Sequence, residues 1–220
     1  MPDFSDPSVS AGAPAATKPE LRAAVLAARR SMPAATRDKA DMELCGALAS
    51  LVSAQRPRLV AGYAAVAGEP GGPGLPAALA AVAPLLLPVV RPDRLLDWAR
   101  YDGDLAPGRY GLPEPTGPRL GPEALRDAEL IVAPALAVDR RGVRLGRGGG
   151  YYDRALAWAA PGVPVVVPLY DGELLPVLPA EPHDRRVHVV VTPATVLPLD
   201  ESGSHAAPLA LEDPECQDGG

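Results

Sequence analysis

The chain has 220 residues, 47 % of them hydrophobic but only 4 % aromatic, and a formal net charge of −6 at pH 7. This length suits one domain with a sizeable core, which Leu, Val and Ala must largely fill. The acidic balance argues against a general nucleic-acid-binding protein, which is usually basic, but leaves room for a small basic pocket for phosphates.

The two ends of the chain differ in composition from the middle. Residues 1–16 are rich in Ala, Pro and Ser without periodicity, and residues 199–220 are polar, acidic and glycine-ended. Such segments bury too little apolar surface to fold, so we expect both to be disordered tails. A single domain is then expected over residues 17–198.

The first predicted element is a helix that starts beside Thr17. Thr17 and Glu20 have the spacing of a capping box. The inward-facing apolar residues of this helix are Leu21, Val25 and Leu26. Lys18 and Arg22 lie four residues apart and project from one face near the helix start. Two cations at the positive end of a helix dipole are unfavourable, so this pair is either a solvated basic face or part of a phosphate site.

Apolar periodicity predicts the remaining elements in alternation. Helices are expected over residues 38–52, 75–82, 122–127 and 151–158, and strands over residues 59–65, 85–90, 96–101, 130–133, 163–167 and 187–191. Pro88 interrupts the second of these strands, which indicates a bulge or an edge there. Strands that alternate with helices favour a layered α/β fold.

No segment of the sequence has the pattern of a membrane span or a signal peptide. Proline and glycine interrupt every long apolar stretch, and the N-terminus is acidic where a signal peptide would be basic. The two cysteines, Cys45 and Cys216, have neither metal-ligand spacing nor a disulfide pattern, and Cys45 lies on an apolar helical face. We therefore expect a cytoplasmic protein whose partners include neither a membrane nor nucleic acid.

The residues from Arg144 to Arg154 combine four glycines, three arginines, two tyrosines and one aspartate. Glycines allow backbone N–H groups to converge on an anion, arginines supply fixed positive charge, and Asp153 can bind a hard cation such as Mg²⁺. The segment matches neither a Walker A motif nor a dinucleotide fingerprint. A glycine-rich surface turn is the alternative, but a strand before it and a helix after it favour a phosphate-binding loop at a helix N-terminus.

Five blocks of this sequence resemble, in order and spacing, the 5-formyltetrahydrofolate cyclo-ligase family, also called the methenyltetrahydrofolate synthetases. The blocks are Lys18 with Arg22, Gly68 with Glu69, residues 108–115, residues 139–154, and residues 182–184 followed by 187–192. Together they span about residues 17 to 197. The order of all five makes the resemblance specific, although each block alone is weak.

The resemblance implies a single-domain α/β/α fold around a central mixed, mostly parallel sheet, of the NagB/RpiA/CoA-transferase-like type. It implies the ATP-dependent conversion of 5-formyltetrahydrofolate to 5,10-methenyltetrahydrofolate with Mg²⁺, through phosphorylation of the formyl oxygen and release of ADP and phosphate. Its partners would be these small molecules, and we expect a monomer. The alternatives are a non-catalytic sensor of folate or nucleotide and a different enzyme on this scaffold, such as a sugar-phosphate isomerase.

The resemblance also implies roles for individual residues. ATP would be bound by Lys18, Arg22, Gly146, Arg147, Gly148, Gly149, Gly150, Tyr151 and Asp153. The folate would be bound by Ala64, Glu69, Gly148, Gly149, Gly150, Tyr151 and Tyr152. Arg147 and Tyr152 would be catalytic, and Asp153 and Asp184 would hold Mg²⁺.

Ordinary structural roles are the alternatives for several of these residues. Asp153 is also a favoured residue at a helix start, and Asp184 is also typical of a turn beside proline. Glu69 before a proline is typical of a loop, and tyrosines that open a helix commonly pack against the core. Tyr110 and Glu114 are expected to shape the pocket, and His183 is given no proton-transfer role. Glu173 stands where many members of the family carry glutamine, which leaves the fine substrate contacts open.

Overall fold

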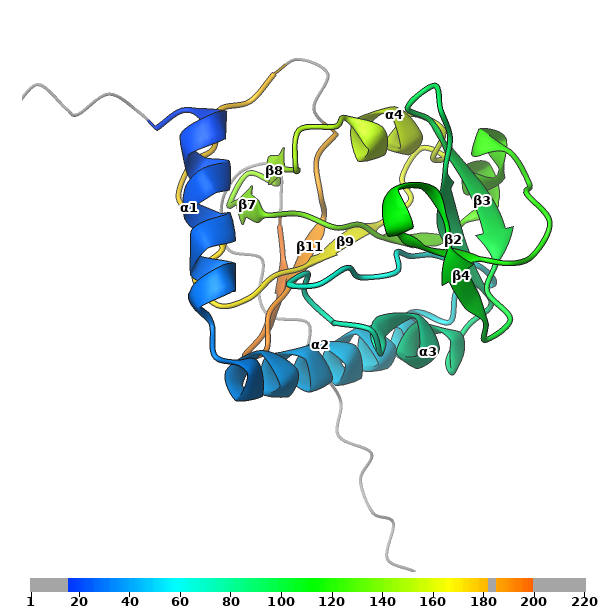
Figure 1. The fold of residues 1–220 in the computed structure, drawn as a ribbon, viewed down its shortest axis with the longest axis horizontal. Coiled ribbons are helices and arrows are strands. Elements are labelled where there is room, and N and C mark those ends of the chain that lie inside the picture. The colour runs from blue at the N-terminus through cyan, green and yellow to red at the C-terminus, as the bar shows by residue number, and fades with distance from the viewer. Residues whose placement is uncertain (1–15, 182–184, 200–220) are drawn as a thin grey trace, which may run out of the picture.

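A seven-stranded sheet forms the centre of the protein, in the order β12-β11-β9-β6-β1-β2-β3 (Figure 1). The computed structural model describes residues 16–181 and 185–199. The strands of this sheet are β1 (Val60–Ala61), β2 (Leu85–Val90), β3 (Leu96–Arg100), β6 (Leu130–Val132), β9 (Val165–Pro168), β11 (Val189–Val191) and β12 (Val196–Pro198). The five inner strands pair in parallel, whereas β3 and β12 pair antiparallel at the two edges. The predicted mixed, mostly parallel sheet is confirmed.

Helical elements cover both faces of this sheet (Figure 1). Helices α2 (Ala34–Gln55) and α3 (Leu75–Ala80) pack on one face, and α4 (Tyr151–Leu156) and the 3₁₀ helix η2 (Pro122–Asp127) pack on the other. The strands serve both cores because their side chains alternate in direction. In β2, for example, Leu85 and Leu87 join the α2 side while Leu86 joins the α4 side. This is the predicted α/β/α arrangement.

Helix α1 (Lys18–Ser31) stands at one end of the molecule beside a second, smaller sheet (Figure 1). The predicted capping box is present: the Glu20 amide donates to the Thr17 hydroxyl, and the Glu20 carboxylate accepts from the Thr17 amide at 2.8 Å. The inward residues Leu21, Val25 and Leu26 pack on the small sheet. Its strands, which the sequence pattern did not predict, are β7 (Ala137–Asp139), β8 (Arg144–Leu145) and β10 (Leu174–Leu175), in the order β10-β7-β8.

Several predicted boundaries were wrong. Helix α2 begins at Ala34 and ends at Gln55, longer at both ends than predicted, and α4 ends at Leu156. The strand predicted over residues 59–65 is only Val60–Ala61, because the chain then leaves the sheet. The antiparallel pair β4 (Leu105–Pro107) and β5 (Pro113–Pro115), with the 3₁₀ turn η1 (Arg109–Gly111) between them, was not predicted.

Of the bulge or edge predicted at Pro88, the bulge is wrong, and the edge applies only on one side of the strand. Strand β2 lies inside the sheet, and Pro88 pairs with Trp98 in an uninterrupted antiparallel register. The proline is tolerated because β1 pairs only with Leu85 and Leu86. On the β1 side no strand pairs with Pro88, so the N–H group that proline lacks is not needed there.

Some earlier expectations fall outside the described residues: most of both tails, Cys216, and the segment that contains His183 and Asp184. Within residues 16–181 and 185–199, no helix combines the length and the apolar character needed to cross a bilayer.

Candidate active site

A cavity of about 500 Å³ opens at the carboxyl ends of the central strands. From β1 the chain continues to β2, which pairs on one side of β1. It later enters β6, which pairs on the other side of β1, so the connections diverge at this point. Ligands of open α/β sheets bind at such a switch point. The cavity is accordingly lined by Tyr63, Ala64 and Glu69 after β1, and by Pro134 and Ala135 after β6.

The glycine-rich loop forms one side of this cavity, with Gly146, Gly148, Gly149 and Gly150 all in its lining. Gly148 has φ of +98° and Gly150 has φ of +67°, backbone conformations that favour glycine. The amides of Gly148, Gly149 and Gly150 donate to no acceptor among the described residues. Helix α4, which follows, is less than two turns long, so an anion here would depend on loop amides and arginines rather than on the predicted helix dipole.

The N-terminal cations reach the same cavity from α1. Arg22 Nε donates to the Gly146 carbonyl at 2.9 Å, and Lys18 Nζ lies 2.9 Å from Glu181 Oε1. Both cations line the cavity, and the Lys18 side chain is only 18 % exposed. The pair is therefore not a solvated basic face. Protein oxygens already offset the unfavourable position of these charges on the helix.

Asp153 lines the cavity and forms an ion pair with Arg144, across the loop. Arg144 is buried, and its Nε has no acceptor within the described part of the chain. From the sequence, Arg144 had only the general positive charge of its block, and this pairing was not predicted, although Arg144 lies nine residues before Asp153. No group of three or more metal-ligating side chains occurs among the described residues. Of the two predicted Mg²⁺ ligands, the structure describes Asp153 alone.

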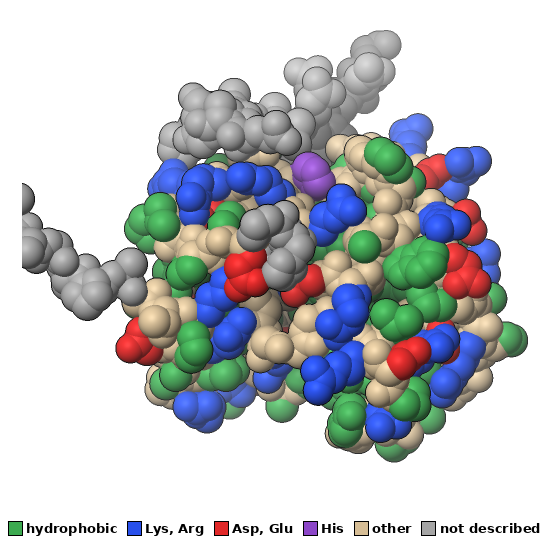
Figure 2. Space-filling view, turned by 90° about the horizontal axis from the view of Figure 1, so that it is seen from above, with side chains coloured by type: hydrophobic (Ala, Val, Ile, Leu, Met, Phe, Trp, Pro, Cys, Tyr) green, Lys and Arg blue, Asp and Glu red, His purple; other side chains and the backbone are tan. Residues whose placement is uncertain are grey.

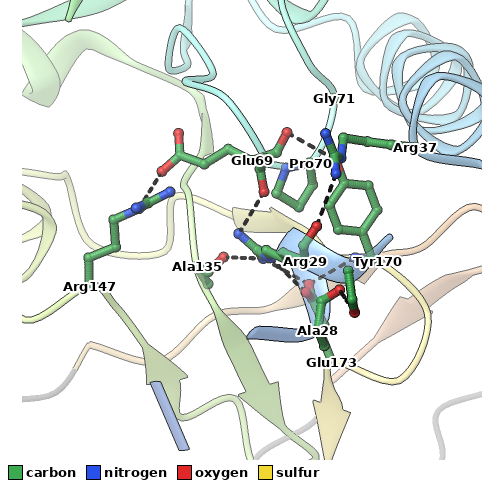
Figure 3. Close-up of polar contacts among 12 residues, drawn as sticks. Ala28, Arg29, Arg37, Glu69, Pro70, Gly71, Ala135, Arg147, Tyr170 and Glu173 are labelled. Atoms are coloured by element: carbon green, nitrogen blue, oxygen red, sulfur yellow. Dashed lines mark hydrogen bonds and ion pairs between the residues drawn. The ribbon is translucent and has the colours of Figure 1, made fainter. Parts of the chain in front are cut away.

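Glu69 and Arg147 both line the cavity, and their side chains point toward each other (Figure 3). Glu69 Oε1 accepts from Arg147 Nε at 2.9 Å, and Glu69 Oε2 accepts from the Val66 amide at 3.1 Å. The Glu69 residue is 9 % exposed, whereas the Arg147 side chain is 47 % exposed. These two residues are 78 positions apart in sequence, and the structure brings them into direct contact. The resemblance gave each a separate role and did not predict this contact.

Both predicted tyrosines line the cavity and also pack into the fold. Burial raises the pKa of Tyr152 far above its ordinary value, so the hydroxyl stays protonated and acts as a hydrogen-bond donor rather than a base. Its oxygen lies 3.4 Å from the Gly62 carbonyl, at the limit of hydrogen bonding. Tyr151 has the Arg154 guanidinium 5.7 Å from its ring centroid. Each tyrosine therefore packs against the core and also faces the cavity.

The unpredicted turn between β4 and β5 completes the cavity with Tyr110, Leu112 and Glu114. Glu114 is buried and accepts from the amides of Val90 at 2.9 Å and Arg109 at 3.3 Å. Tyr110 is 72 % exposed at the rim. These contacts agree with the pocket-shaping role expected for both residues.

The charges of the cavity are balanced. Its lining contains four cations and four carboxylates within the described chain: Lys18, Arg22, Arg144 and Arg147, and Glu69, Glu114, Asp153 and Glu181. The face seen from above likewise shows basic and acidic side chains side by side (Figure 2). A polyphosphate would thus meet individual cations rather than a strongly positive field.

Fold and site together define an α/β protein with a glycine-rich loop beside a cavity at the switch point of its sheet. The comparisons with known proteins name the family. A profile described as the 5-formyltetrahydrofolate cyclo-ligase family matches residues 14–193. The protein named 5-formyltetrahydrofolate cyclo-ligase of Mycolicibacterium smegmatis is 43 % identical over 184 residues, which cover 80 % of this chain and 94 % of that one. The chain belongs to the 5-formyltetrahydrofolate cyclo-ligase family.

Solved structures agree with this assignment. The NMR structure of Aquifex aeolicus 5,10-methenyltetrahydrofolate synthetase superposes with a TM-score of 0.71 at 29 % identity, covering 91 % of this chain and 99 % of that one. The Mycoplasma pneumoniae 5,10-methenyltetrahydrofolate synthetase, at 18 % identity, has a TM-score of 0.64 over 80 % of this chain and 98 % of its own, and supports the fold alone.

Proposed function

We propose that this protein converts 5-formyltetrahydrofolate to 5,10-methenyltetrahydrofolate with consumption of ATP. The observation that carries the proposal is one cavity in which Glu69 and Arg147 meet beside a glycine loop whose amides have no described acceptor. A carboxylate suits the N–H groups of a reduced pterin, and amides with arginines suit a triphosphate. Family membership supports both ligands.

The chemistry requires activation of a formamide, which is a poor electrophile. In the proposed reaction the formyl oxygen attacks the γ-phosphorus and ADP leaves. N10 of the same folate then attacks the formyl carbon, the C–O bond breaks to release phosphate, and N10 loses its proton. The protein performs no covalent step, so its contribution is alignment of the formyl oxygen with the γ-phosphate and stabilisation of charge there.

The residues of the cavity divide this task between them. Arg147 would donate to the transferred phosphoryl group, since its side chain is half-exposed and only its Nε is engaged by Glu69. Glu69 would exchange that arginine for the pterin edge. Lys18 and Arg22 would contact the outer phosphates from α1, and the protonated Tyr152 hydroxyl would donate to the folate. Each ligand replaces a partner that the charged group already has, so no charge is left buried and unpaired.

We also propose that Mg²⁺ accompanies the nucleotide. Mg²⁺ commonly uses one or two protein carboxylates beside phosphates and water, and the Asp153 carboxylate, 35 % exposed in the cavity lining, fits that requirement. Asp184 is the second ligand in the proposal. When bound, the ion would offset negative charge on the phosphates. The four cations of the lining would not offset that charge, because four carboxylates already balance them.

A turnover assay tests the proposal. Purified protein with ATP, Mg²⁺ and 5-formyltetrahydrofolate should form the methenyl product, which is followed by its near-ultraviolet absorbance. Turnover should stop when EDTA is added and resume with excess Mg²⁺. Folded protein that binds folate or ATP without turnover would instead establish the sensor.

A further inference from the structure

The loop that carries Glu69 has an unusual support on its far side. Four consecutive carbonyls each meet a side chain from outside residues 66–71. Gly68 O is 3.4 Å from Arg29 Nη1, Glu69 O is 3.2 Å from the Tyr170 hydroxyl, Pro70 O accepts from the Tyr63 hydroxyl at 2.6 Å, and Gly71 O accepts from the Cys45 thiol at 3.2 Å. The backbone of this loop is therefore fixed by side chains rather than by strand pairing.

A buried ion pair anchors one end of this support. Arg29 of α1 donates to both carboxylate oxygens of Glu173, at 2.7 and 2.8 Å, and to the Ala135 carbonyl at 2.8 Å. The side chains of Arg29 and Glu173 are only 3 % and 8 % exposed. Ala135 and the Gly68–Glu69 segment belong to two different sides of the cavity, so one guanidinium group ties both together (Figure 3).

Asp41 of α2 anchors the other end. Its Oδ1 accepts from the Tyr170 hydroxyl at 2.7 Å and from the Gly71 amide at 2.9 Å. Tyr170 in turn donates its amide to Glu173 at 3.0 Å, and its ring lies 5.5 Å from the Arg29 guanidinium carbon. Asp41, Tyr170 and Glu173 are thus linked, and none of the three lines the cavity.

The Glu69 carboxylate points the opposite way, toward Arg147 (Figure 3). We infer that Arg29, Asp41, Tyr170 and Glu173, here called the brace, are positioning residues that set the Glu69 carboxylate for the donor edge of the reduced pterin. The inference rests on the proposed function. The brace acts through the loop backbone, because its contacts with the loop are to main-chain atoms.

Two substitutions at the Asp41 end test the brace. Asp41→Ala removes the acceptor shared by Tyr170 and Gly71, and Tyr170→Phe removes the hydroxyl between Asp41 and the Glu69 carbonyl. Each should weaken binding of 5-formyltetrahydrofolate about tenfold, the effect of one hydrogen bond to a charged group, while the KM for ATP stays within about twofold. Asp41→Asn keeps Oδ1 as an acceptor for both donors and should restore folate affinity to within about twofold of the parent.

Matched controls separate positioning from stability. Asp38→Ala changes an exposed aspartate three residues earlier on the same helix, and Tyr101→Phe removes a tyrosine hydroxyl outside the cavity lining. Neither should alter folate affinity. The dissociation constant is measured calorimetrically without ATP, and the two KM values by turnover.

The results distinguish the brace from the proposed function. If the parent protein neither binds folate nor turns over, the proposed function fails. If the parent does both, but Asp41→Ala and Tyr170→Phe lower only the melting temperature, the brace is merely structural and the inference is overturned. Equal damage by Asp41→Asn and Asp41→Ala would also overturn it, since the acceptor geometry would then be irrelevant.

Discussion

The two sides of the cavity are built in opposite ways. The glycine wall, residues 146–150, follows the short strand β8 and is largely exposed, with two of its glycines at positive φ. The glutamate wall, residues 66–71, is held from behind by the buried side chains of Arg29 in α1 and Tyr170, and by partly buried side chains of α2. Changes in the glycine wall should therefore affect nucleotide use more than stability, whereas changes behind the glutamate wall should affect stability and folate affinity.

The largest expected effect is that of Glu173→Ala. This substitution leaves Arg29 buried without its carboxylate, which costs about 3–5 kcal/mol of unfolding free energy in comparable sites. Glu173→Gln, which introduces the residue that the resemblance led us to expect, retains one acceptor oxygen and should lose less. Urea unfolding followed by circular dichroism measures the difference.

An exposed pair of the same chemistry provides the control. Arg58 donates to Glu129 at 2.6 Å, but these side chains are 90 % and 36 % exposed. Glu129→Ala should leave the urea midpoint nearly unchanged, since solvent already screens this pair. Equal losses of stability for Glu173→Ala and Glu129→Ala would show that the buried Arg29–Glu173 pair stabilises the fold no more than an exposed pair does.

Asp153→Asn should have the next largest effect, with a large loss of turnover and a smaller loss of stability, because the buried Arg144 loses its charged partner but keeps an acceptor oxygen. The substitution removes the carboxylate charge proposed to bind Mg²⁺, and it should lower kcat roughly 10–100-fold and raise the Mg²⁺ concentration needed. Rates are measured over a Mg²⁺ series at saturating ATP. Asp127→Asn, an exposed aspartate outside the cavity, should keep parental rates. Parental Mg²⁺ dependence in Asp153→Asn would remove this residue from the metal site.

Gly148→Ala should have an intermediate effect on the glycine wall. A side chain at φ of +98° is strained by about 1–2 kcal/mol, so the loop amides should shift and the KM for ATP rise about tenfold. Gly103→Ala is the matched control, because Gly103 has φ of +111° with nothing within 4 Å of an added Cβ. The control should share the loss of stability but keep the parental KM for ATP. If the KM for ATP rose in both variants, the rise would come from lost stability and not from the loop amides.

Local signals predicted much of the fold. The capping box at Thr17 and the apolar runs of β2 and β6 depend on neighbouring residues, and each was found close to its predicted place. The sheet of β7, β8 and β10 was missed because β7 and β8 each include a charged residue and β10 has only two residues, so none of them carries an apolar run like that around β6. The resemblance supplied the residues of the cavity, but it did not give their partners.

Those partners could not be predicted because they are set by tertiary structure. Arg29 and Glu173 are 144 positions apart, and no local pattern relates them. Glu173 was recognised only as a departure from the family, whereas in the fold it is the counter-ion of a buried arginine. The role of Arg144 was missed for a similar reason: its burial against Asp153 depends on how β8 turns into the glycine loop.

The smallest expected effect is that of Lys18→Ala, at the outer edge of the glycine wall. Lys18 is paired with Glu181, so its removal costs one charge-assisted contact to a phosphate and should raise the KM for ATP only about three- to tenfold. The KM for folate should not change, because Lys18 acts from α1 and lies outside the glutamate wall. Steady-state kinetics with each substrate varied in turn separates the two values, with Lys39→Ala, an exposed lysine of α2, as control. A parental KM for ATP would return Lys18 to a purely structural role with Glu181. A change in the folate KM would instead show that the two walls do not act independently.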